Sequence, residues 1–405
     1  MHFDGYICII LHILRFFVKY CGMFTECFNA VHNPRPYPLT RFGAYYTMFI
    51  MKINDKKVPL FLILIAFGLL YLFLAAESTG KKLNIRPEWT VSIDNPTINT
   101  TQTSAHLLPF KMGEKMGYYT ADGKVGALIP FEHRAAISAD FWTEYDRDAE
   151  RIAFFTPDNQ SSGIFDRSGF PFFDAGGIFL FHPGGSSFSK HDKEGKTEWL
   201  YENYVPITAF SSSTAGCAAG FADGNLVCFD RSGKVTGGFY PGGSNMEVIF
   251  GAALSQSGTY CACLSGLDPQ RIVVAEPAGG KTKIIYHEYL KDELREQTLV
   301  QFSSDDRYVF FSGKGALISV FLPQKKAFFV PFSGKIVSIS EFGDKDIFFV
   351  LSKDAETYTV TILSEGKHKR GSFSFKASNA FVHSENGDIY VGCDGGISKM
   401  HISFD

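Results

Sequence analysis

The sequence predicts an all-β fold that follows a single N-terminal transmembrane helix. From about Glu88 to the C-terminus, short apolar or alternating runs are bounded by Gly, Asp, Asn, Ser and Pro, which is the signature of strands joined by turns. Short turn motifs recur in this region at a nearly constant spacing, as expected of a fold built from repeated units. Ahead of it, residues 58–76 contain no charge and are long enough to cross about 30 Å of hydrocarbon as a helix.

The composition is that of a folded chain and excludes two other classes of protein. The 405 residues include 39 Lys and Arg against 42 Asp and Glu, so the formal net charge of −3 excludes a basic protein that coats polyanions. Apolar residues make up 45% of the chain, which is too many for a disordered protein. The 39 Gly and 41 Phe residues fit many short strands separated by tight turns.

The N-terminal part of the chain is predicted to contain a leader, a stub, an anchor and a linker. We interpret the leader as a segment of uncertain status upstream of the true start, because Met48 or Met51 opens a conventional basic and then apolar start. The predicted segments are the leader at residues 1–50, a short cytoplasmic stub at 51–57, the transmembrane anchor at 58–76, a linker at 77–87 and the β domain at 88–405.

Charges near the apolar run predict its orientation. Lys52, Lys56 and Lys57 form a basic flank that tends to stay in the cytoplasm, so we expect a single-pass protein of the bacterial inner membrane with its β domain in the periplasm. A cleaved signal peptide is an alternative, since residues 74–76 (Leu-Ala-Ala) loosely imitate a cleavage site, but the apolar run is longer than usual. If residues 6–24 spanned the membrane instead, the β domain would be cytoplasmic.

Internal repeats predict the number of units in the β domain. Phe-Asp-Arg-Ser-Gly occurs at residues 165–169 and 229–233, and a His or Tyr followed by Pro-Gly-Gly-Ser occurs at 182–186 and 240–244. In such turns Asp bonds the backbone two residues on, and Gly takes the positive φ that closes a hairpin. The turns begin near residues 122, 166, 230, 276, 323 and 364, with spacings of 41–47 residues and one of 64.

This spacing predicts a ring of β-sheets. A repeat of about 40–50 residues is that of a four-stranded β-propeller blade, and six internal turns plus a terminal unit predict a seven-bladed β-propeller. A hairpin-like insertion from Phe188 to Tyr201 accounts for the long spacing, and counting it as a degenerate blade gives eight blades. The last unit stops one strand short of four, and Trp89–Asp94 can supply the missing outer strand and close the ring.

One repeat resembles a known family. Residues 219–235 read Ala-Gly-Phe-Ala-Asp-Gly-Asn-Leu-Val-Cys-Phe-Asp-Arg-Ser-Gly-Lys-Val, so that a Gly-x-x-Asp-Gly hairpin leads to a strand that ends in Asp before a Gly-Lys turn. This segment resembles one repeat of the WD40-like and quinoprotein-like β-propeller superfamily. The resemblance implies a propeller over most of residues 100–405, with binding or catalysis at the mouth of its central channel.

The sequence points to no catalytic centre, metal or cofactor. His182, His191 and Asp192 form the densest group of ionisable residues, but their spacing matches no metal-ligand template. The five Cys of the β domain form no CxxC pair, and we expect them to be buried as small apolar residues. The basic cluster at residues 367–370 is too short for a nucleic-acid interface. We therefore predict no cofactor and no nucleic-acid partner.

Aromatic residues near the insertion form the candidate partner-binding site. Trp199, Tyr201 and Tyr204 are of the type that concentrates binding energy in interfaces, although they can instead pack against neighbouring blades. The sequence therefore predicts a membrane-anchored, non-catalytic scaffold that binds or assembles proteins in the bacterial cell envelope. The alternatives are a propeller enzyme, either a quinoprotein-like oxidoreductase or a hydrolase, and a sensor that binds a ligand in the central channel.

Overall fold

The structure is a computed structural model that describes residues 67–68, 83–93, 106–174, 177–278, 281–343 and 346–404. The chain divides into two compact units, residues 1–80 and 81–405, and nearly all described residues belong to the second unit. Among the described residues, no helix is long and apolar enough to cross a bilayer. Except for Phe67 and Gly68, the predicted leader, stub and anchor lie outside the described residues.

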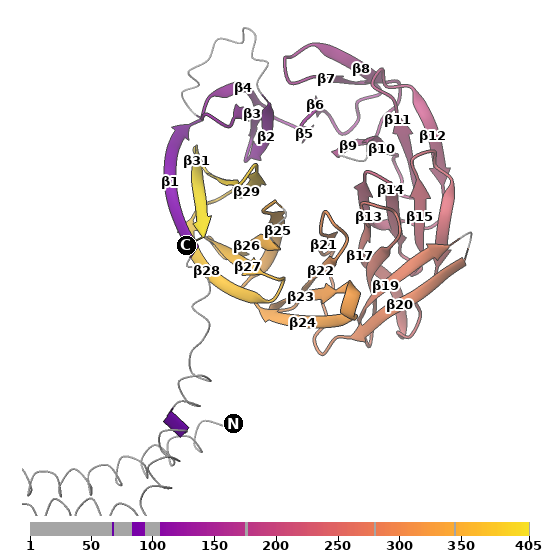
Figure 1. The fold of residues 1–405 in the computed structure, drawn as a ribbon. Coiled ribbons are helices and arrows are strands. Elements are labelled where there is room, and N and C mark those ends of the chain that lie inside the picture. Colours follow the sequence, from indigo (N-terminus) through magenta and orange to yellow (C-terminus); the bar gives the residue numbers. More distant parts are fainter. Residues whose placement is uncertain are drawn as a thin grey trace, which may run out of the picture. The chain divides into compact units, whose positions relative to one another are not determined.

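The second unit is a ring of eight antiparallel sheets, or blades, that follow one another in chain order (Figure 1). In blades 1 to 7 the first strand lies innermost and later strands lie progressively further out. The first four blades consist of β2 (Leu107–Met112), β3 (Lys115–Thr120) and β4 (Val125–Pro130); β5 (Arg134–Ile137), β6 (Trp142–Tyr145), β7 (Ile152–Phe155) and β8 (Ser161–Phe165); β9 (Phe170–Asp174), β10 (Gly177–Phe181), β11 (Ser187–His191) and β12 (Thr197–Glu202); and β13 (Ile207–Ser213), β14 (Gly216–Phe221), β15 (Leu226–Asp230) and β16 (Val235–Phe239).

The remaining four blades each contain four strands. Blades 5 to 7 consist of β17 (Met246–Leu254), β18 (Cys261–Leu267), β19 (Arg271–Ala278) and β20 (Lys281–Tyr289); β21 (Val300–Phe302), β22 (Tyr308–Gly313), β23 (Ala316–Phe321) and β24 (Lys326–Pro331), with the 3-10 helix η1 (Leu322–Gln324) before β24; and β25 (Lys335–Glu341), β26 (Ile347–Asp354), β27 (Thr357–Ser364) and β28 (His368–Lys376). Blade 8 combines β29 (Ala380–Glu385), β30 (Asp388–Cys393) and β31 (Gly396–Phe404) with β1 (Leu83–Ser92).

The predicted count of seven blades is wrong, and the alternative of eight is confirmed. The segment interpreted as an insertion, residues 188–201, is the outer hairpin of a complete blade 3, formed by β11 and β12. The two copies of Phe-Asp-Arg-Ser-Gly are not equivalent in the structure. The copy at 165–169 leads from blade 2 to blade 3, whereas the copy at 229–233 lies in the outer hairpin of blade 4. The spacing of 64 residues therefore spans one whole blade and most of the next.

The outer hairpins of blades 3 and 4 contain equivalent turns. In both, Oδ1 of the leading aspartate, Asp192 or Asp230, accepts hydrogen bonds of 2.7–3.1 Å from the backbone amides two and four residues later. Gly195 and Gly233 occupy the position before the last amide with φ of +88° and +81°. The sequence Asp-Lys-Glu-Gly-Lys at 192–196 is thus the repeat signal of blade 3 that the sequence analysis missed.

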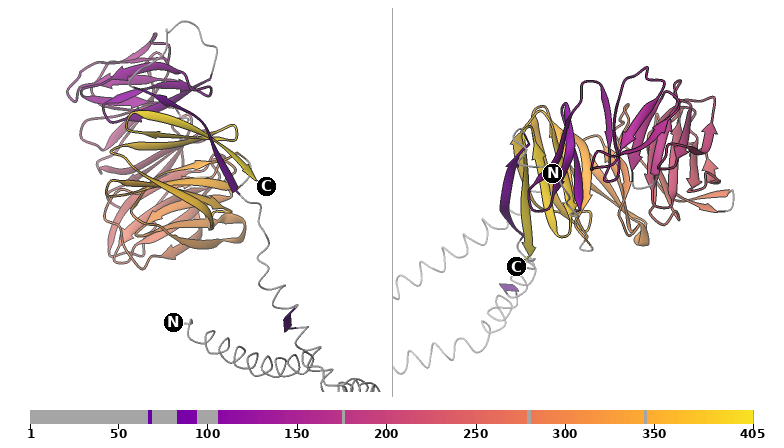
Figure 2. Two further views of the ribbon diagram at one scale, coloured as in Figure 1. Left: turned by 90° about the vertical axis from the view of Figure 1, so that its left-hand side faces the viewer. Right: turned by 90° about the horizontal axis from the view of Figure 1, so that it is seen from above.

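Ring closure by the N-terminal strand is confirmed. β1 pairs antiparallel with β31 from Leu83↔Phe404 to Ser92↔Gly396, with an irregularity between Pro87 and Trp89, and it forms the outer strand of blade 8 (Figure 2). The strand begins at Leu83, so residues 83–87 of the predicted linker belong to the blade. Because the first and last segments of the unit share one sheet, blade 8 cannot form until both are present.

The core of the unit lies between neighbouring blades. Eight clusters of buried apolar residues are each shared by two neighbouring blades. One of them, which contains Tyr119 and Tyr390, joins blade 8 to blade 1. Four of the five Cys, all except Cys393, are buried and unpaired in it, which confirms their expected role as small apolar residues. Burial raises the pKa of the Cys263 thiol, and such thiols stay protonated and inert. The stability of the unit therefore depends on blade-to-blade packing around the whole ring.

Candidate protein-binding face

The connections between strands divide the ring into two faces. Because successive strands of a blade run in opposite directions, the middle hairpin turn of each of blades 2 to 7 and the connection to the next blade lie at the same end of the strands. We call this end the connector face. It carries both Pro-Gly-Gly-Ser loops, one as the middle turn of blade 3 and the other as the connection from blade 4 to blade 5.

Large apolar side chains are exposed on the connector face of blades 3 to 5. Tyr204 lies in the connection from blade 3 to blade 4 and is fully exposed, while Tyr240 and Met246 flank the next connection and are 56% and 59% exposed. Tyr289, at the end of β20, is 46% exposed. Single exposed apolar residues are common, but four on successive connections of one face make this face the candidate interaction surface.

Hydrogen bonds join these connections in series. In blades 3 and 4, the amide of Ala222 donates to the carbonyl of Pro206 over 2.9 Å, and the hydroxyl of Tyr240 donates to Oδ2 of Asp223 over 3.1 Å. In blade 5, the Asn245 amide donates to the carbonyl of Asp268 over 3.0 Å. The loops therefore form a connected platform whose backbone is held in place by hydrogen bonds, and an ordered backbone lowers the entropy cost of association.

Farther along the platform, a buried arginine supports its aromatic edge. Arg271 is only 6% exposed, donates a hydrogen bond to the carbonyl of Pro241 and lies 5.7 Å from the centre of the Tyr289 ring. A cation in contact with an aromatic face attracts it electrostatically, more strongly when both are shielded from water. Arg271 thus ties the Pro-Gly-Gly-Ser loop before blade 5 to the exposed Tyr289.

The structure separates the three residues predicted to bind a partner. Trp199 and Tyr201 are half-buried between blades 3 and 4. The centres of their rings lie 5.9 Å and 4.7 Å, respectively, from the centre of the Phe229 ring. Trp199 also donates its indole hydrogen to the carbonyl of Arg231 over 3.1 Å. Tyr204 is the exposed member of the set, and it lies on the platform.

Acidic groups near the platform affect the ionisation of its tyrosines. The hydrogen bond to Asp223 raises the pKa of Tyr240, and burial together with the charge of Asp223 raises the pKa of Tyr201. Both phenols therefore keep their hydrogen at neutral pH and act as donors. This part of the platform thus presents neutral hydroxyl groups near the carboxylate of Asp223.

A groove lies between blades 5 and 6 on the connector face. It encloses about 500 Å³ between Tyr289 and Phe329, which is 50% exposed, and its floor includes the buried Leu290 and Ile318. The groove is continuous with the platform through Tyr289. Its volume and apolar floor leave room for a large apolar side chain together with neighbouring atoms of a bound molecule.

The inner strands of blades 3 to 7 surround a second space. This central cavity of about 680 Å³ is lined by aromatic residues such as Phe172 and Phe210 and by polar residues such as Gln301. Ser212 donates a hydrogen bond of 2.7 Å to Asp174 at its wall. The volume is within the range of small-molecule sites, and the lining is mostly uncharged.

Among the described residues, the histidines of different blades do not meet in one pocket. His182 and His191 meet in blade 3, where their Nε2 atoms lie 2.9 Å and 2.7 Å from Oγ of the fully buried Ser189. His191 Nδ1 lies 2.8 Å from the carbonyl oxygen of Gly195, so its proton is on Nδ1 and Ser189 donates to Nε2. His133, His287 and His383 belong to other blades, and none of the five lines the central cavity.

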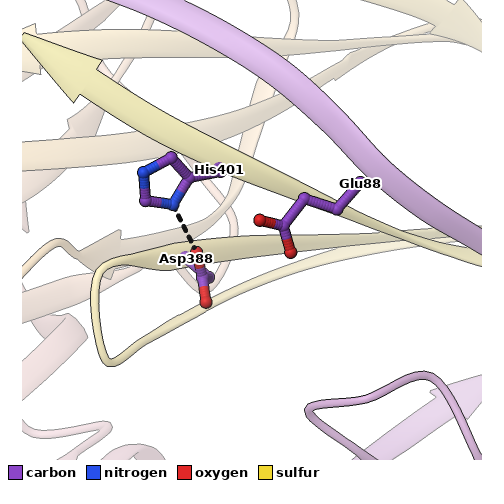
Figure 3. A group of neighbouring side chains, drawn as sticks. All are labelled: Glu88, Asp388 and His401. Carbon is purple, nitrogen blue, oxygen red and sulfur yellow. Dashed lines mark hydrogen bonds and ion pairs between the residues drawn. The ribbon is translucent and has the colours of Figure 1, made fainter.

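A group of ionisable residues crosses the closing blade (Figure 3). Glu88 of β1, Asp388 of β30 and His401 of β31 have ligand atoms within 4.8 Å of one another, an arrangement that could hold a metal ion. The ammonium of Lys399 already lies 2.8 Å from Glu88 and 3.0 Å from Asp388. Because this fixed cation occupies the carboxylates, the group does not suit a metal and instead joins β1 to the rest of blade 8.

Comparison with known proteins agrees with this architecture. A family model described as "beta-propeller protein" matches residues 51–404. The chain belongs to this β-propeller family. An uncharacterized protein of Treponema pallidum (strain Nichols) is 30% identical to the propeller chain over 368 residues, which cover 87% of the chain and 96% of the relative.

Solved structures share the fold at low sequence identity. BamB from Moraxella catarrhalis superposes with a TM-score of 0.54 at 11% identity, covering 78% of the propeller chain and 100% of BamB. Sqt1 from Saccharomyces cerevisiae superposes with a TM-score of 0.49 at 12% identity, covering 63% and 77% of the two chains. At these identities the likeness concerns the fold alone.

Most of the platform was missed in the sequence analysis. Tyr240, Met246 and Tyr289 are far apart along the chain, and only the closed ring places them on consecutive connections. One signal was available, because Tyr240 directly precedes a Pro-Gly-Gly-Ser turn and turn-flanking aromatics are expected at loop tips.

Proposed function

We propose that this propeller is a non-catalytic protein-binding or assembly scaffold of the bacterial cell envelope. The observation that carries the proposal is the platform of blades 3 to 5, where exposed Tyr204, Tyr240, Met246 and Tyr289 project from connections joined to one another by hydrogen bonds. Exposed tyrosines on a pre-organised surface favour protein recognition, since they bury a large area at little conformational cost. The shared fold with BamB is compatible with such a role.

Membrane attachment is part of the proposal and rests on the sequence. The uncharged run at residues 58–76 would anchor the chain in the inner membrane, with the basic stub inside and the propeller in the periplasm. An anchor raises the local concentration of the propeller near membrane-bound partners. Membrane fractionation, followed by protease treatment of spheroplasts, tests this: digestion of the propeller only after the outer membrane is opened supports a periplasmic location.

Site-specific photocrosslinking tests the platform. A photoreactive phenylalanine analogue placed at Tyr204 or Tyr240 should capture the same partner in intact cells, because both side chains lie on the platform. The matched control position is Val235, which is 45% exposed but lies at the opposite end of β16. Equal capture from all three positions, or capture from Val235 alone, would reject the platform as the binding site.

The central cavity supports a second candidate function, that of a ligand sensor. Its volume of about 680 Å³ and its aromatic and amide lining suit an uncharged small molecule. Native mass spectrometry of the purified propeller would show a bound molecule as a constant mass increment, and Ser211→Trp should remove it by filling the cavity, because Ser211 lines the cavity and is only partly buried. Absence of an increment at every stage of gentle purification speaks against this candidate.

A further inference from the structure

Acidic residues are concentrated on the platform. Its segments, residues 200–206, 222–225, 240–247, 268–271 and 288–293, contain seven carboxylates and two basic residues, Arg271 and Lys291, a balance of −5 on a chain whose total formal charge is −3. The carboxylates belong to Glu202, Asp223, Glu247, Asp268, Glu288, Asp292 and Glu293. The rest of the chain is therefore slightly basic, and the acidity is local.

This charge is not neutralised within the structure. None of the seven carboxylates forms an ion pair with another described residue, and their interactions are hydrogen bonds with neutral groups such as the Tyr240 hydroxyl and the Asn245 amide. Of the two basic residues, Arg271 is buried beneath Tyr289, where it donates a hydrogen bond to the carbonyl of Pro241 and forms an ion pair with none of the seven carboxylates. The platform thus presents an uncompensated negative field, which attracts cationic surfaces and repels nucleic acids and anionic lipid headgroups.

The groove beside the platform favours a partner that carries an apolar side chain. Tyr289 and Phe329 form its exposed walls above the buried Leu290 and Ile318, so an apolar side chain can pack there. Charged residues also line the groove: Glu288, Lys291, Asp292 and Lys314. Interfaces concentrate their energy where one large side chain fills such a pocket, and the surrounding polar contacts contribute orientation.

We infer that the partner binds the platform through a cationic segment that carries one large apolar anchor residue. The anchor, of the size of Leu or Phe, enters the groove between blades 5 and 6, and flanking Lys or Arg residues face the carboxylates of blades 4 and 5. This inference rests on the proposed function, because it specifies the chemistry of the partner that the platform recognises.

The test uses defined peptides with the complete propeller protein. The probe is the fluorescein-labelled peptide Gly-Lys-Arg-Lys-Leu-Phe-Lys-Arg-Lys-Gly, compared with one peptide in which Leu-Phe is replaced by Ser-Ser and one in which every basic residue is replaced by Glu. Fluorescence polarisation at 50 and 200 mM salt measures binding. We expect binding of the first peptide, at least tenfold weaker binding of the second and no binding of the third.

Variants of the protein locate the contact. Glu202→Gln, Glu247→Gln and Asp292→Asn together should weaken binding and reduce its dependence on salt, and Tyr289→Ser with Phe329→Ser should remove the preference for the Leu-Phe peptide. The control triple variant, Asp140→Asn, Asp158→Asn and Glu194→Gln, removes exposed carboxylates near turns at the opposite face and should leave binding unchanged. Thermal unfolding of every variant establishes that the fold is retained.

Three outcomes overturn the inference: no binding of the Leu-Phe peptide, equal binding of the Ser-Ser peptide, and equal loss in the control triple variant. The proposed function has a separate test. If photocrosslinking at Tyr204 and Tyr240 captures a protein whose crosslinked segment is neutral or acidic, the scaffold function stands and the cationic chemistry is rejected. If no protein is captured there while the peptide binds as expected, the charge and groove are correctly described and the scaffold function fails.

Discussion

Lys399 of β31 links three strands of the closing blade. Its side chain is only 15% exposed and contacts Glu88 of β1 and Asp388 of β30 at the same time. Burial opposes its charge, but the hydrogen bonds to the two carboxylates outweigh this effect and raise the pKa of Lys399. The lysine therefore stays protonated at neutral pH.

Replacement of this lysine should weaken the ring. We expect Lys399→Met to lower the free energy of unfolding by about 1–3 kcal/mol, because two neighbouring carboxylates lose their shared cation. The matched control is Lys124→Met, which removes an exposed pair with Asp122 and should cost less than about 1 kcal/mol. Urea denaturation of both variants measures the difference, and equal losses would show that Lys399 has no special role.

The two histidines around Ser189 make stability depend on pH. Burial lowers the pKa of His182 and of His191, and the nearby charge of Arg167 lowers both further, while carboxylates including Asp192 and Glu202 act in the opposite direction. The folded protein therefore keeps both imidazoles neutral, whereas the unfolded chain binds protons below about pH 6.5. Stability should fall as the pH decreases through that value, since the unfolded state then binds more protons.

Replacement of one of these histidines should make the free energy of unfolding less dependent on pH. We expect His191→Gln to cost about 1 kcal/mol at pH 7.5 through weaker hydrogen bonding, but to lose less stability than the wild type between pH 7.5 and 5.5. His133→Gln is the control, because that side chain is exposed. Urea midpoints at the two pH values provide the measurement, and a wild-type midpoint that does not move between them would contradict the prediction.

At the scale of single elements, the outer hairpin turns fix the register of the blades. Gly233 has a φ of +81°, and a Cβ at this position would lie 2.5 Å from the Trp199 ring of blade 3. A turn of blade 4 thus also sets the packing of its neighbour. Gly242 has a similar φ of +65°, but a Cβ added there would meet no other atom within 4 Å.

These two glycines separate backbone strain from crowding. We expect Gly242→Ala to cost about 1–2 kcal/mol from its left-handed conformation alone, and Gly233→Ala to cost about 1–3 kcal/mol more because Trp199 must move. Thermal and urea unfolding compare the variants, and a red shift of the Trp fluorescence only in Gly233→Ala would report the displacement. Similar losses in the free energy of unfolding for both variants would mean that the Trp199 ring can move aside without cost.

Turn chemistry explains both the success and the failure of the sequence analysis at this scale. Strands and turns were identifiable because Asp230 and Gly233 have local roles that their residue types reveal. The blade count failed because Phe-Asp-Arg-Ser-Gly occupies two different positions, and at 165–169 its glycine does not adopt a positive φ. The same five-residue sequence can occur in different kinds of turn, and only the pairing of the flanking strands distinguishes them.

For the molecule as a whole, β1 determines whether the ring is closed. It pairs along the full length of β31, and its removal would expose the edge of that strand and open the cluster shared by blades 7 and 8, to which Ile85 contributes. Exposed strand edges promote association between chains. Closure could be predicted from sequence, because the last unit visibly lacked a strand, whereas the platform could not, because its residues meet only after closure.

A pair of truncated chains tests this role. A chain that begins at residue 81 should unfold in one cooperative transition as a monomer, whereas one that begins at residue 94 should unfold at least 10 °C lower and self-associate through its open edge. Differential scanning calorimetry and light scattering after size exclusion measure the two properties. Equal melting temperatures and monomeric behaviour of both chains would show that β1 is dispensable.

The direction of the strands in blade 8 has a practical consequence for handling this protein. β1 starts and β31 ends at the face opposite the connector face. An affinity tag, a fluorescent fusion or a sensor-chip linkage added before β1 or after β31 is therefore attached away from Tyr204 and Tyr240, and immobilised protein keeps these tyrosines accessible to molecules in solution.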